Sequence, residues 1–251
     1  MNIAKRWLIA ILFVATHLSA NEITIAVAAN VSYAIDELVE VFHQDHPDTK
    51  VRVILGSSGK LAAQISHGAP YGILMSANMA YPYRLYKSHI AISEPVVYAK
   101  GALAILSIKK VDISKSLELL KEPSIHKIAM GNPKTAPYGE ATLEALKNAK
   151  IYSAIKSKLI YGESISQTLS YTITAADIGI VAKSALYSSQ LKSYKEGINW
   201  ISIDNSLYTP ISQGIVLLKY GEKDPSYRLF YDYILSRKGK EILQRYGYST
   251  I

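Results

Sequence analysis

The stretch VRVILGSSGKLAAQISH, residues 51–67, has the pattern of one complete strand–loop–helix unit. Val51–Leu55 is a short apolar run rich in β-branched residues, which is typical of a buried strand. Gly56–Gly59 is a loop of small polar residues, and Lys60–His67 follows it as a helix. Strands that alternate with helices build βαβ units, so this stretch predicts an α/β fold with a largely parallel sheet.

The same alternation extends to both sides of this unit. Upstream, Ile23–Val27 is a second buried strand, and Tyr33–His43 carries apolar residues at helical spacing. Downstream, Ile73–Met75 is a third strand. A further series of elements then follows, with a helix at 140–147 and strands at 102–106, 127–130, 177–181, 200–203 and 215–218.

The last segment of the chain predicts one long helix opened by Asp224–Ser226, with the proline near the first turn, where its missing N–H costs little. No Gly/Ser-rich linker, low-complexity tract or internal repeat occurs in the 251 residues. Two α/β lobes without a flexible connector are expected to be joined at defined strands, near Val97–Lys100 and Asp204–Pro210. We therefore assign residues 21–98 and 207–251 to one lobe and residues 99–206 to the other.

The first twenty residues have the features of a secretory signal peptide. Lys5 and Arg6 form a short positive region, Trp7–Thr16 is an unbroken, mostly apolar run, and Ala20 is a small residue at the expected cleavage point. The alternative is an N-terminal membrane anchor, but the apolar run is far shorter than the roughly 20 residues that span a bilayer. We therefore expect residues 1–20 to be removed and the mature chain to be periplasmic.

Composition and charge limit the classes of protein to consider. The chain has no cysteine, so an exported form is held together by burial rather than by disulfides, and it has no cysteine for a lipid anchor. The formal net charge is +8, or +6 without Lys5 and Arg6. This balance favours anionic partners, although scattered lysines are also what a solvated surface shows. Without an Arg-rich arm or a basic stripe, nucleic acid is not an expected partner.

Three loops of small polar residues lie where strands give way to helices: Ala28–Ser32, Gly56–Lys60 and Gly131–Gly139. In an open parallel sheet, ligands bind beyond the carboxyl ends of the strands, where helix N-termini offer free N–H groups. Each loop alone is explained by helix capping, but three of them in two lobes favour a shared anion site. The second loop is not a P-loop, because Walker A needs four residues between its glycines.

Metal and catalytic motifs are weak. His43 and His46 have Asp45 between them, but no third ligand is evident, and histidines just before Pro47 suit the negative end of a helix. No Gly-x-Ser-x-Gly elbow occurs. A periplasmic hydrolase stays open as a remote alternative, which a contact between Ser58 and a histidine would support.

Several short sequence segments, spread over essentially the whole mature chain, form a pattern when taken in order. They are Ala28–Ala34, Gly56–Ile65, Gly68–Pro70, Ser76–Ala77, Gly131–Pro133, Ala136–Gly139, Gly162–Ile165, Gly179–Val181 and a C-terminal set within Phe230–Tyr248. In their order and spacing these blocks resemble the molybdate-binding protein family of periplasmic receptors.

The resemblance implies a type II periplasmic-binding-protein fold, an α/β fold of two lobes, each a mixed, mostly parallel sheet flanked by helices, with the ligand in the cleft between the lobes. It implies a monomeric receptor without enzymatic activity or cofactor, which delivers molybdate, and tungstate with it, to the permease of an ABC importer in the inner membrane. The oxyanion donors that carry over to this chain are Asn30, Ser58, Tyr138 and Ile165, and the pocket-lining residues are Ala29, Ser57 and Ala182.

This chain departs from the family pattern at five positions. Asn30 stands where many members have serine, and Tyr138 where many have alanine. Ala182 stands where many have a tyrosine whose hydroxyl meets the anion. Alanine supplies no such donor, and our hypothesis is that the Tyr138 hydroxyl or the Asn30 amide replaces it. Gly72 and Asn132 replace common aspartates.

A cage of neutral N–H and O–H donors suits a fully deprotonated dianion such as molybdate, tungstate or sulfate. Protonated phosphate would leave donors unpaired, so this cage discriminates against it. A receptor for sulfate or for a small organic acid is the alternative. An organic acid is expected to need an arginine, and the three loops contain none.

Overall fold

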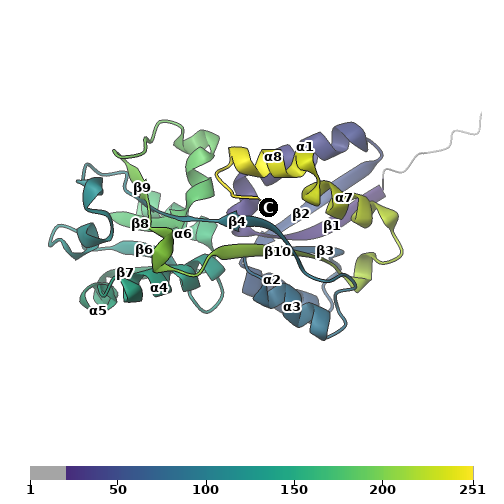
Figure 1. Cartoon of the computed structure of the whole chain (residues 1–251), viewed down its shortest axis with the longest axis horizontal. Helices are drawn as coiled ribbons and strands as arrows, with labels where there is room; N and C mark the ends of the chain where they lie inside the picture. The colour runs from purple at the N-terminus through teal and green to yellow at the C-terminus, as the bar shows by residue number, and fades with distance from the viewer. Residues whose placement is uncertain (1–20, 251) are drawn as a thin grey trace, which may run out of the picture.

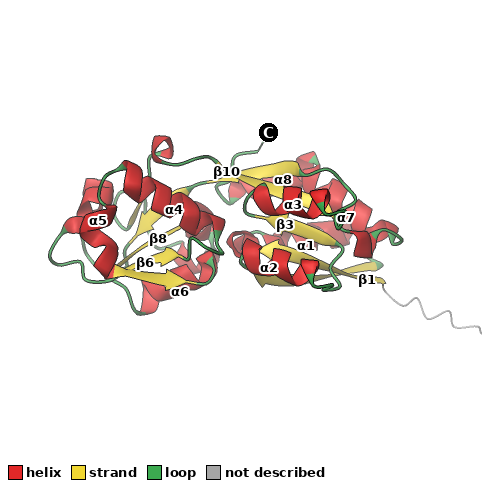
Figure 2. Cartoon of the chain, turned by 90° about the horizontal axis from the view of Figure 1, so that it is seen from below, coloured by secondary structure: helices red, strands yellow, loops and turns green. Residues whose placement is uncertain are grey.

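The computed structural model describes residues 21–250, and within them the chain forms two five-stranded sheets, each in its own lobe (Figure 1). Figure 2 shows the two lobes from below, with helices packed around each sheet. The predicted signal peptide, residues 1–20, lies outside the described residues. None of the helices between residues 21 and 250 has the length and the apolar character of a membrane span.

The first sheet has the strand order β2-β1-β3-β10-β4. β1 runs parallel to β2 and β3, whereas β10 runs antiparallel to β3 and β4. Its strands are β1 (Asn21–Ala28), β2 (Thr49–Gly56), β3 (Ile73–Ser76), β4 (Val96–Gly101) and β10 (Ile211–Leu217).

Each face of the first sheet has its own core, because side chains of a strand alternate between faces. Ile23 and Ile25 of β1 pack with α1, α7 and α8 on one face, and Ala26 packs with α2 and α3 on the other. Coverage on both faces explains why β1 is apolar almost throughout. The helices of this lobe are η1 (Ala29–Tyr33), α1 (Ile35–Asp45), α2 (Ser58–Ser66), α3 (Ala80–Lys87), η7 (Lys219–Gly221), α7 (Pro225–Leu235) and α8 (Arg237–Arg245).

The second sheet has the strand order β7-β6-β8-β5-β9, with α4 packed on one face and α6 on the other. β6 is parallel to β7 and β8, and β5 is antiparallel to β8 and β9. The strands are β5 (Leu103–Leu106), β6 (Ile128–Gly131), β7 (Leu159–Gly162), β8 (Ile178–Ala182) and β9 (Trp200–Ser202). The helices are η2 (Ile113–Lys121), α4 (Pro137–Asn148), α5 (Tyr152–Ile155), η3 (Lys156–Lys158), α6 (Ile165–Thr174), η4 (Lys183–Tyr187), η5 (Ser189–Leu191) and η6 (Asn205–Leu207).

β4 and β10 lie side by side and carry the chain between the lobes (Figure 1). The chain leaves the first sheet at Gly101 and enters the second at Leu103. It returns from β9 through η6 to β10, which begins at Ile211. The lobe boundaries at residues 98 and 206 stay a prediction. β4 runs across the first of them, from Val96 to Gly101.

The sheets are mixed and mostly parallel, as expected: within residues 21–250, four of the five strands in each sheet run in one direction, and only β10 in the first sheet and β5 in the second run against them. One detail differs from the predicted architecture. The single long C-terminal helix is wrong, because the chain breaks at Ser236, whose backbone is extended with a ψ of 167°. The Ser236 hydroxyl accepts the N–H of Gly239 and so caps α8 as a separate helix.

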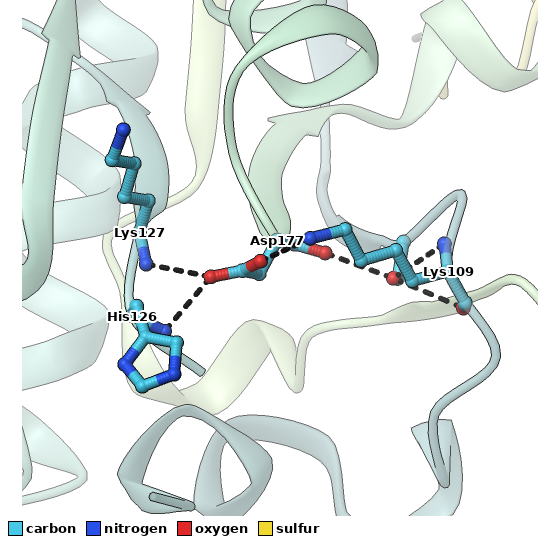
Figure 3. Close-up of polar contacts among 5 residues, drawn as sticks. Lys109, His126, Lys127 and Asp177 are labelled. Atoms are coloured by element: carbon cyan, nitrogen blue, oxygen red, sulfur yellow. Dashed lines mark hydrogen bonds and ion pairs between the residues drawn. The ribbon is translucent and has the colours of Figure 1, made fainter. Parts of the chain in front are cut away.

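Asp177 ties together the segments that lead into β8 and β6. Its carboxylate accepts hydrogen bonds of 2.8 Å from the N–H groups of His126 and Lys127, and it pairs with the Lys109 ammonium (Figure 3). The Lys109 contact, followed by the two N–H bonds, lowers the pKa of Asp177 to about 2. The cluster lies at the amino ends of these strands, so we treat it as a source of stability.

Candidate functional site

A small cavity lies between the lobes, beyond the carboxyl ends of β1, β2 and β6. Parallel strands bring their carboxyl ends to one edge of a sheet, so short loops from both lobes meet there. All four predicted oxyanion donors line this cavity, together with two of the three predicted lining residues. The lining residues are Ala28, Ala29, Asn30, Ser57, Ser58, Ala77, Ala136, Pro137, Tyr138 and Ile165.

Three helices begin at this cavity. α2 begins at Ser58, α4 at Pro137 and α6 at Ile165, and the first N–H groups of a helix have no partner within it. Proline has no N–H, so the first N–H of α4 is that of Tyr138. Three positive helix ends with free N–H groups make the cavity a favourable place for an anion.

Ser58 is 1% exposed, and a contact from outside its own helix orients its hydroxyl. The Oγ atom accepts a hydrogen bond of 2.9 Å from the backbone N–H of Ala77, just after β3. A hydroxyl oxygen that accepts this bond still has its hydrogen to donate. Ser57 precedes it as the N-cap residue of α2, with extended backbone. The Ser58 hydroxyl is therefore a donor available to the cavity.

Asn30 is buried, and its side chain and its backbone have different partners. Its Nδ2 donates to Gln213 Oε1 at 2.7 Å and to the Tyr248 hydroxyl at 3.0 Å. The carbonyl oxygen of Ala29 accepts a bond of 2.8 Å from Ser166 Oγ. In a planar trans peptide the C=O and the next N–H point in opposite directions, so the N–H of Asn30 points away from Ser166. The backbone N–H of Asn30, rather than its side-chain amide, is thus the group left for an anion.

Tyr138 is 1% exposed, and its hydroxyl accepts a hydrogen bond of 3.2 Å from Gln213 Nε2. Burial raises the pKa of Tyr138, and those of Tyr98 and Tyr248 beside it, well above the usual value. All three hydroxyls therefore stay protonated at neutral pH; Tyr98 donates to Gln213 Oε1 and Tyr248 to the carbonyl oxygen of Asn30, and the Tyr138 hydrogen is left without a partner among the described residues. Gly101 leaves room for this arrangement, because a Cβ there would lie 1.9 Å from the Tyr138 hydroxyl oxygen.

Hydrogen bonds between the lobes surround the cavity. The N–H of Gly59 donates to the carbonyl oxygen of Thr135 at 3.1 Å, which joins the start of α2 to the loop before α4. Ser166 of α6 donates to Ala29, and Ser184 donates to the carbonyl oxygen of Asn30 at 3.1 Å. These contacts hold the two lobes together around the small space between them.

Comparison of the sequence with known proteins identifies the family of this chain. The model of the bacterial extracellular solute-binding protein family matches residues 23–249. The molybdate-binding proteins ModA of Rhodobacter capsulatus and Azotobacter vinelandii are each 32% identical to the chain, over 92% and 91% of it and 90% of their own lengths. The chain belongs to the molybdate-binding protein family of solute-binding proteins. It is a solute-binding protein and not an enzyme.

Solved structures agree with this assignment. The periplasmic molybdate-binding protein of Azotobacter vinelandii matches with a TM-score of 0.83 and 26% identity, over 91% of this chain and 99% of that one. The sulfate-binding protein SubI of Mycobacterium tuberculosis has a TM-score of 0.75 at 11% identity, over 92% and 87% of the two chains, and shares the fold alone. The predicted two-lobed periplasmic-binding-protein fold is confirmed.

The third predicted lining residue of this solute-binding protein lies elsewhere. Ala182 ends β8 and is buried, but it is outside the cavity lining, in the same apolar cluster as Tyr138. Of the other lining residues, Ala28, Ala136 and Pro137 lie in the loops that the sequence indicated as the anion site, and only Ala77 lies outside those loops.

The structure of the described residues also tests two alternatives from the sequence analysis, a metal site at His43 and His46 and a hydrolase that uses Ser58. Within residues 21–250, no group of three His, Cys, Asp or Glu side chains could hold a metal ion. His43 contacts the carbonyl oxygen of Thr49, and the His46 ring packs on Phe42 at 4.6 Å. Ser58 bonds to a backbone N–H, and the described cavity lining contains no histidine to activate it.

Proposed function

We propose that this solute-binding protein captures molybdate, and tungstate with it, in the cavity between its lobes. The observation that carries the proposal is the convergence of three helix starts and the Ser58 hydroxyl on one small cavity. The described residues that line it include no charged side chain. The relatives that are molybdate-binding proteins by name support the choice of this anion.

In this proposal the anion is held by the N–H groups of Asn30, Tyr138 and Ile165 and by the hydroxyl of Ser58. Hydrogen bonds to a charged group each contribute about 1.5–3 kcal/mol net, so a small number of donors is enough for tight binding. A fully deprotonated dianion accepts from every donor around it. Phosphate carries a proton near neutral pH, and that proton would face donors instead of an acceptor, which disfavours it.

We further propose that the Tyr138 hydroxyl replaces the tyrosine donor that many family members have at position 182. Two facts support this assignment. Tyr138 lines the cavity, and Ala182 belongs to the same buried cluster. The side-chain amide of Asn30, the other candidate, already donates to Gln213 and Tyr248.

The proposed partner is the permease of an ABC importer, which would recognise the closed pair of lobes. The family of extracellular solute-binding proteins supports this partner and a location outside the cytoplasm. We propose that residues 1–20 direct export to the periplasm and are removed after Ala20; a monomeric mature protein remains our expectation. Mass spectrometry of the exported protein should find Asn21 at its N-terminus, and retention of residues 1–20 would contradict the cleavage.

Calorimetric titration of the mature protein with molybdate, tungstate, sulfate and phosphate tests the proposal. We expect tight binding of molybdate and tungstate, weaker binding of sulfate and no measurable binding of phosphate. Tight binding of sulfate without a response to molybdate would reject the assignment in favour of a sulfate receptor. Binding of a small organic acid alone would reject it as well.

A further inference from the structure

Gln213 lies directly behind the cavity, on a strand that links the lobes. It is 0% exposed and belongs to β10, next to a shift in the register between β10 and β4. A primary amide carries two N–H donors and a carbonyl acceptor, and buried amides are retained where these groups find partners. The partners of Gln213 therefore indicate what it does.

Gln213 contacts two residues that line the cavity, one from each lobe. Its Oε1 accepts from Asn30 Nδ2 at 2.7 Å and from the Tyr98 hydroxyl at 2.9 Å. Its Nε2 donates to the Tyr138 hydroxyl at 3.2 Å. Two donors, Asn30 Nδ2 and the Tyr98 hydroxyl, point at Oε1. If the amide were turned by 180°, Nε2 would take the place of Oε1 and its N–H groups would face these donors. With Asn30 Nδ2 as its neighbour, the Gln213 amide is favoured in the orientation that sets Oε1 toward Asn30 and Tyr98 and Nε2 toward Tyr138.

This orientation determines which groups remain for a ligand. The Tyr138 oxygen accepts from Gln213, which leaves the Tyr138 hydrogen to be donated elsewhere. The Asn30 Nδ2 group donates to Gln213 and Tyr248, so the backbone N–H is the donor of Asn30 that remains for an anion; in the described chain its Oδ1 has no hydrogen-bond partner. A Cβ at position 101 would lie 2.8 Å from Gln213 Nε2, so Gly101 keeps the space that this network occupies.

We infer that Gln213 is a positioning residue for the anion site, which aligns Asn30 of one lobe and the Tyr138 hydroxyl of the other toward the same ligand. This inference rests on the proposed oxyanion function and assigns it a further residue. Gln213 acts through Tyr138 and Asn30, since it is not among the residues that line the cavity. Because it bonds to both lobes, it also links the hydrogen bonds at the ligand to β10, which carries the chain between the lobes.

A double-mutant cycle in molybdate binding tests this role, because residues that act through one contact give non-additive effects. Gln213→Met removes all three hydrogen bonds at similar length and should weaken binding about tenfold or more. Tyr138→Phe should weaken it by a similar factor. In the Tyr138→Phe background, Gln213→Met should cost less than about threefold in affinity. Circular dichroism and thermal unfolding of each ligand-free variant report its fold, and Gln213→Asn replaces Gln213→Met if the latter does not fold.

Tyr227→Phe is the matched control for lost stability. The Tyr227 hydroxyl accepts the N–H of Thr24 at 3.1 Å, and neither residue lines the cavity. This variant should bind molybdate within about twofold of wild type, and Gln213→Met should keep its full effect in the Tyr227→Phe background.

The outcomes separate this inference from the proposed function. Wild-type protein that binds none of the four oxyanions overturns both. Wild-type binding together with a Gln213→Met variant that binds within twofold of it overturns only the role of Gln213, and so do effects of Gln213→Met and Tyr138→Phe that simply multiply.

Discussion

The hydroxyl oxygen of Ser58 accepts the backbone N–H of Ala77 at 2.9 Å, so the segment that follows β3 orients the first residue of α2. Both residues line the cavity between the lobes. The contact uses the acceptor side of the hydroxyl and leaves its hydrogen for a ligand. A donor fixed before the ligand arrives does not lose side-chain freedom on binding, which favours affinity.

Ser58→Ala should weaken oxyanion binding by about 1–3 kcal/mol, which is the loss of one hydrogen bond to a charged acceptor. It also leaves the N–H of Ala77 without its partner, so a modest loss of thermal stability is expected with it. Calorimetric titration with molybdate measures the first effect, and thermal unfolding without ligand measures the second.

Ser66→Ala is the control within the same helix. Its hydroxyl donates to the carbonyl oxygen of Ala62 at 2.9 Å, and it does not line the cavity. This variant should bind molybdate as the wild type does. If Ser58→Ala also keeps full affinity, Ser58 is not part of the site.

Ile165→Pro tests a donor that belongs to the backbone. Ile165 is the first residue of α6, a position where proline is tolerated because the N–H has no partner in the helix. The preceding Ser164 has φ −136° and ψ 164°, an extended conformation that proline accepts after it. The substitution removes the N–H from the cavity and should weaken molybdate binding by about 1–3 kcal/mol.

Ile165→Val keeps the N–H and changes only the side chain, so it serves as the control for packing. Its molybdate affinity should stay near that of the wild type, because a branched aliphatic side chain of similar shape replaces the original one. Equal affinities of Ile165→Pro and Ile165→Val would show that this N–H does not bind the anion.

Gly59→Ala should make closure of the two lobes less favourable. A Cβ at position 59 would lie 3.0 Å from the carbonyl oxygen of Thr135, in the other lobe, and 2.7 Å from the Tyr81 hydroxyl. The tyrosine tip can move aside, but the Thr135 backbone must shift, which opposes the closed arrangement. We expect faster release of molybdate and an affinity reduced severalfold, measured by stopped-flow dissociation. Stability without ligand should hold or rise, because alanine favours a helix by about 0.5–1 kcal/mol over glycine.

Gly68→Ala should give the opposite pair of effects. Gly68 has a φ of +86°, and no atom lies within 4 Å of its hypothetical Cβ. Alanine there is strained, so stability should fall by about 1 kcal/mol while molybdate release stays unchanged. If both glycine variants release molybdate at the wild-type rate, the contact between Gly59 and Thr135 does not govern closure.

The loops of the site could be predicted from the sequence because each forms within a few residues. Gly56–Gly59 follows an apolar run and precedes a helical one, so a strand end and a helix start are both visible there. Chain direction was harder to predict. An isolated strand pattern does not indicate which neighbours it will pair with, and β10 runs antiparallel to both β3 and β4. The break at Ser236 was missed because apolar spacing continues across it into α8.

Gln213 could not be found by the same reasoning. One glutamine in a strand segment such as ISQGIVL fits a solvent-facing position. Its partners Asn30, Tyr98 and Tyr138 lie 183, 115 and 75 residues away along the chain. Contacts of such long range arise from the pairing of distant segments within the first lobe and, for Tyr138, from the packing of the two lobes, and local pattern carries no information about them.

The lowered pKa of Asp177 allows a prediction of how the stability of the protein depends on pH. Its pKa is about 2 in the folded protein, below the ordinary value of 3.8, so folding favours its charged form. The resulting stabilisation is fully present above about pH 4 and is lost as the pH falls through about 2. Because Lys109 is largely exposed, the pair is partly screened, and we expect a contribution of about 1–2 kcal/mol at neutral pH.

Asp177→Asn should therefore lower the melting temperature at pH 7 by a few degrees, and the difference from wild type should shrink as the pH approaches 2. Asp232→Asn is the control, since Asp232 pairs with Arg228 at 2.8 Å on an exposed helix face, where an ion pair contributes little. Thermal unfolding of both variants between pH 2 and pH 7 makes the comparison. A constant difference between Asp177→Asn and wild type across this range would mean that the charge of Asp177 is not what holds the segments before β6 and β8 together.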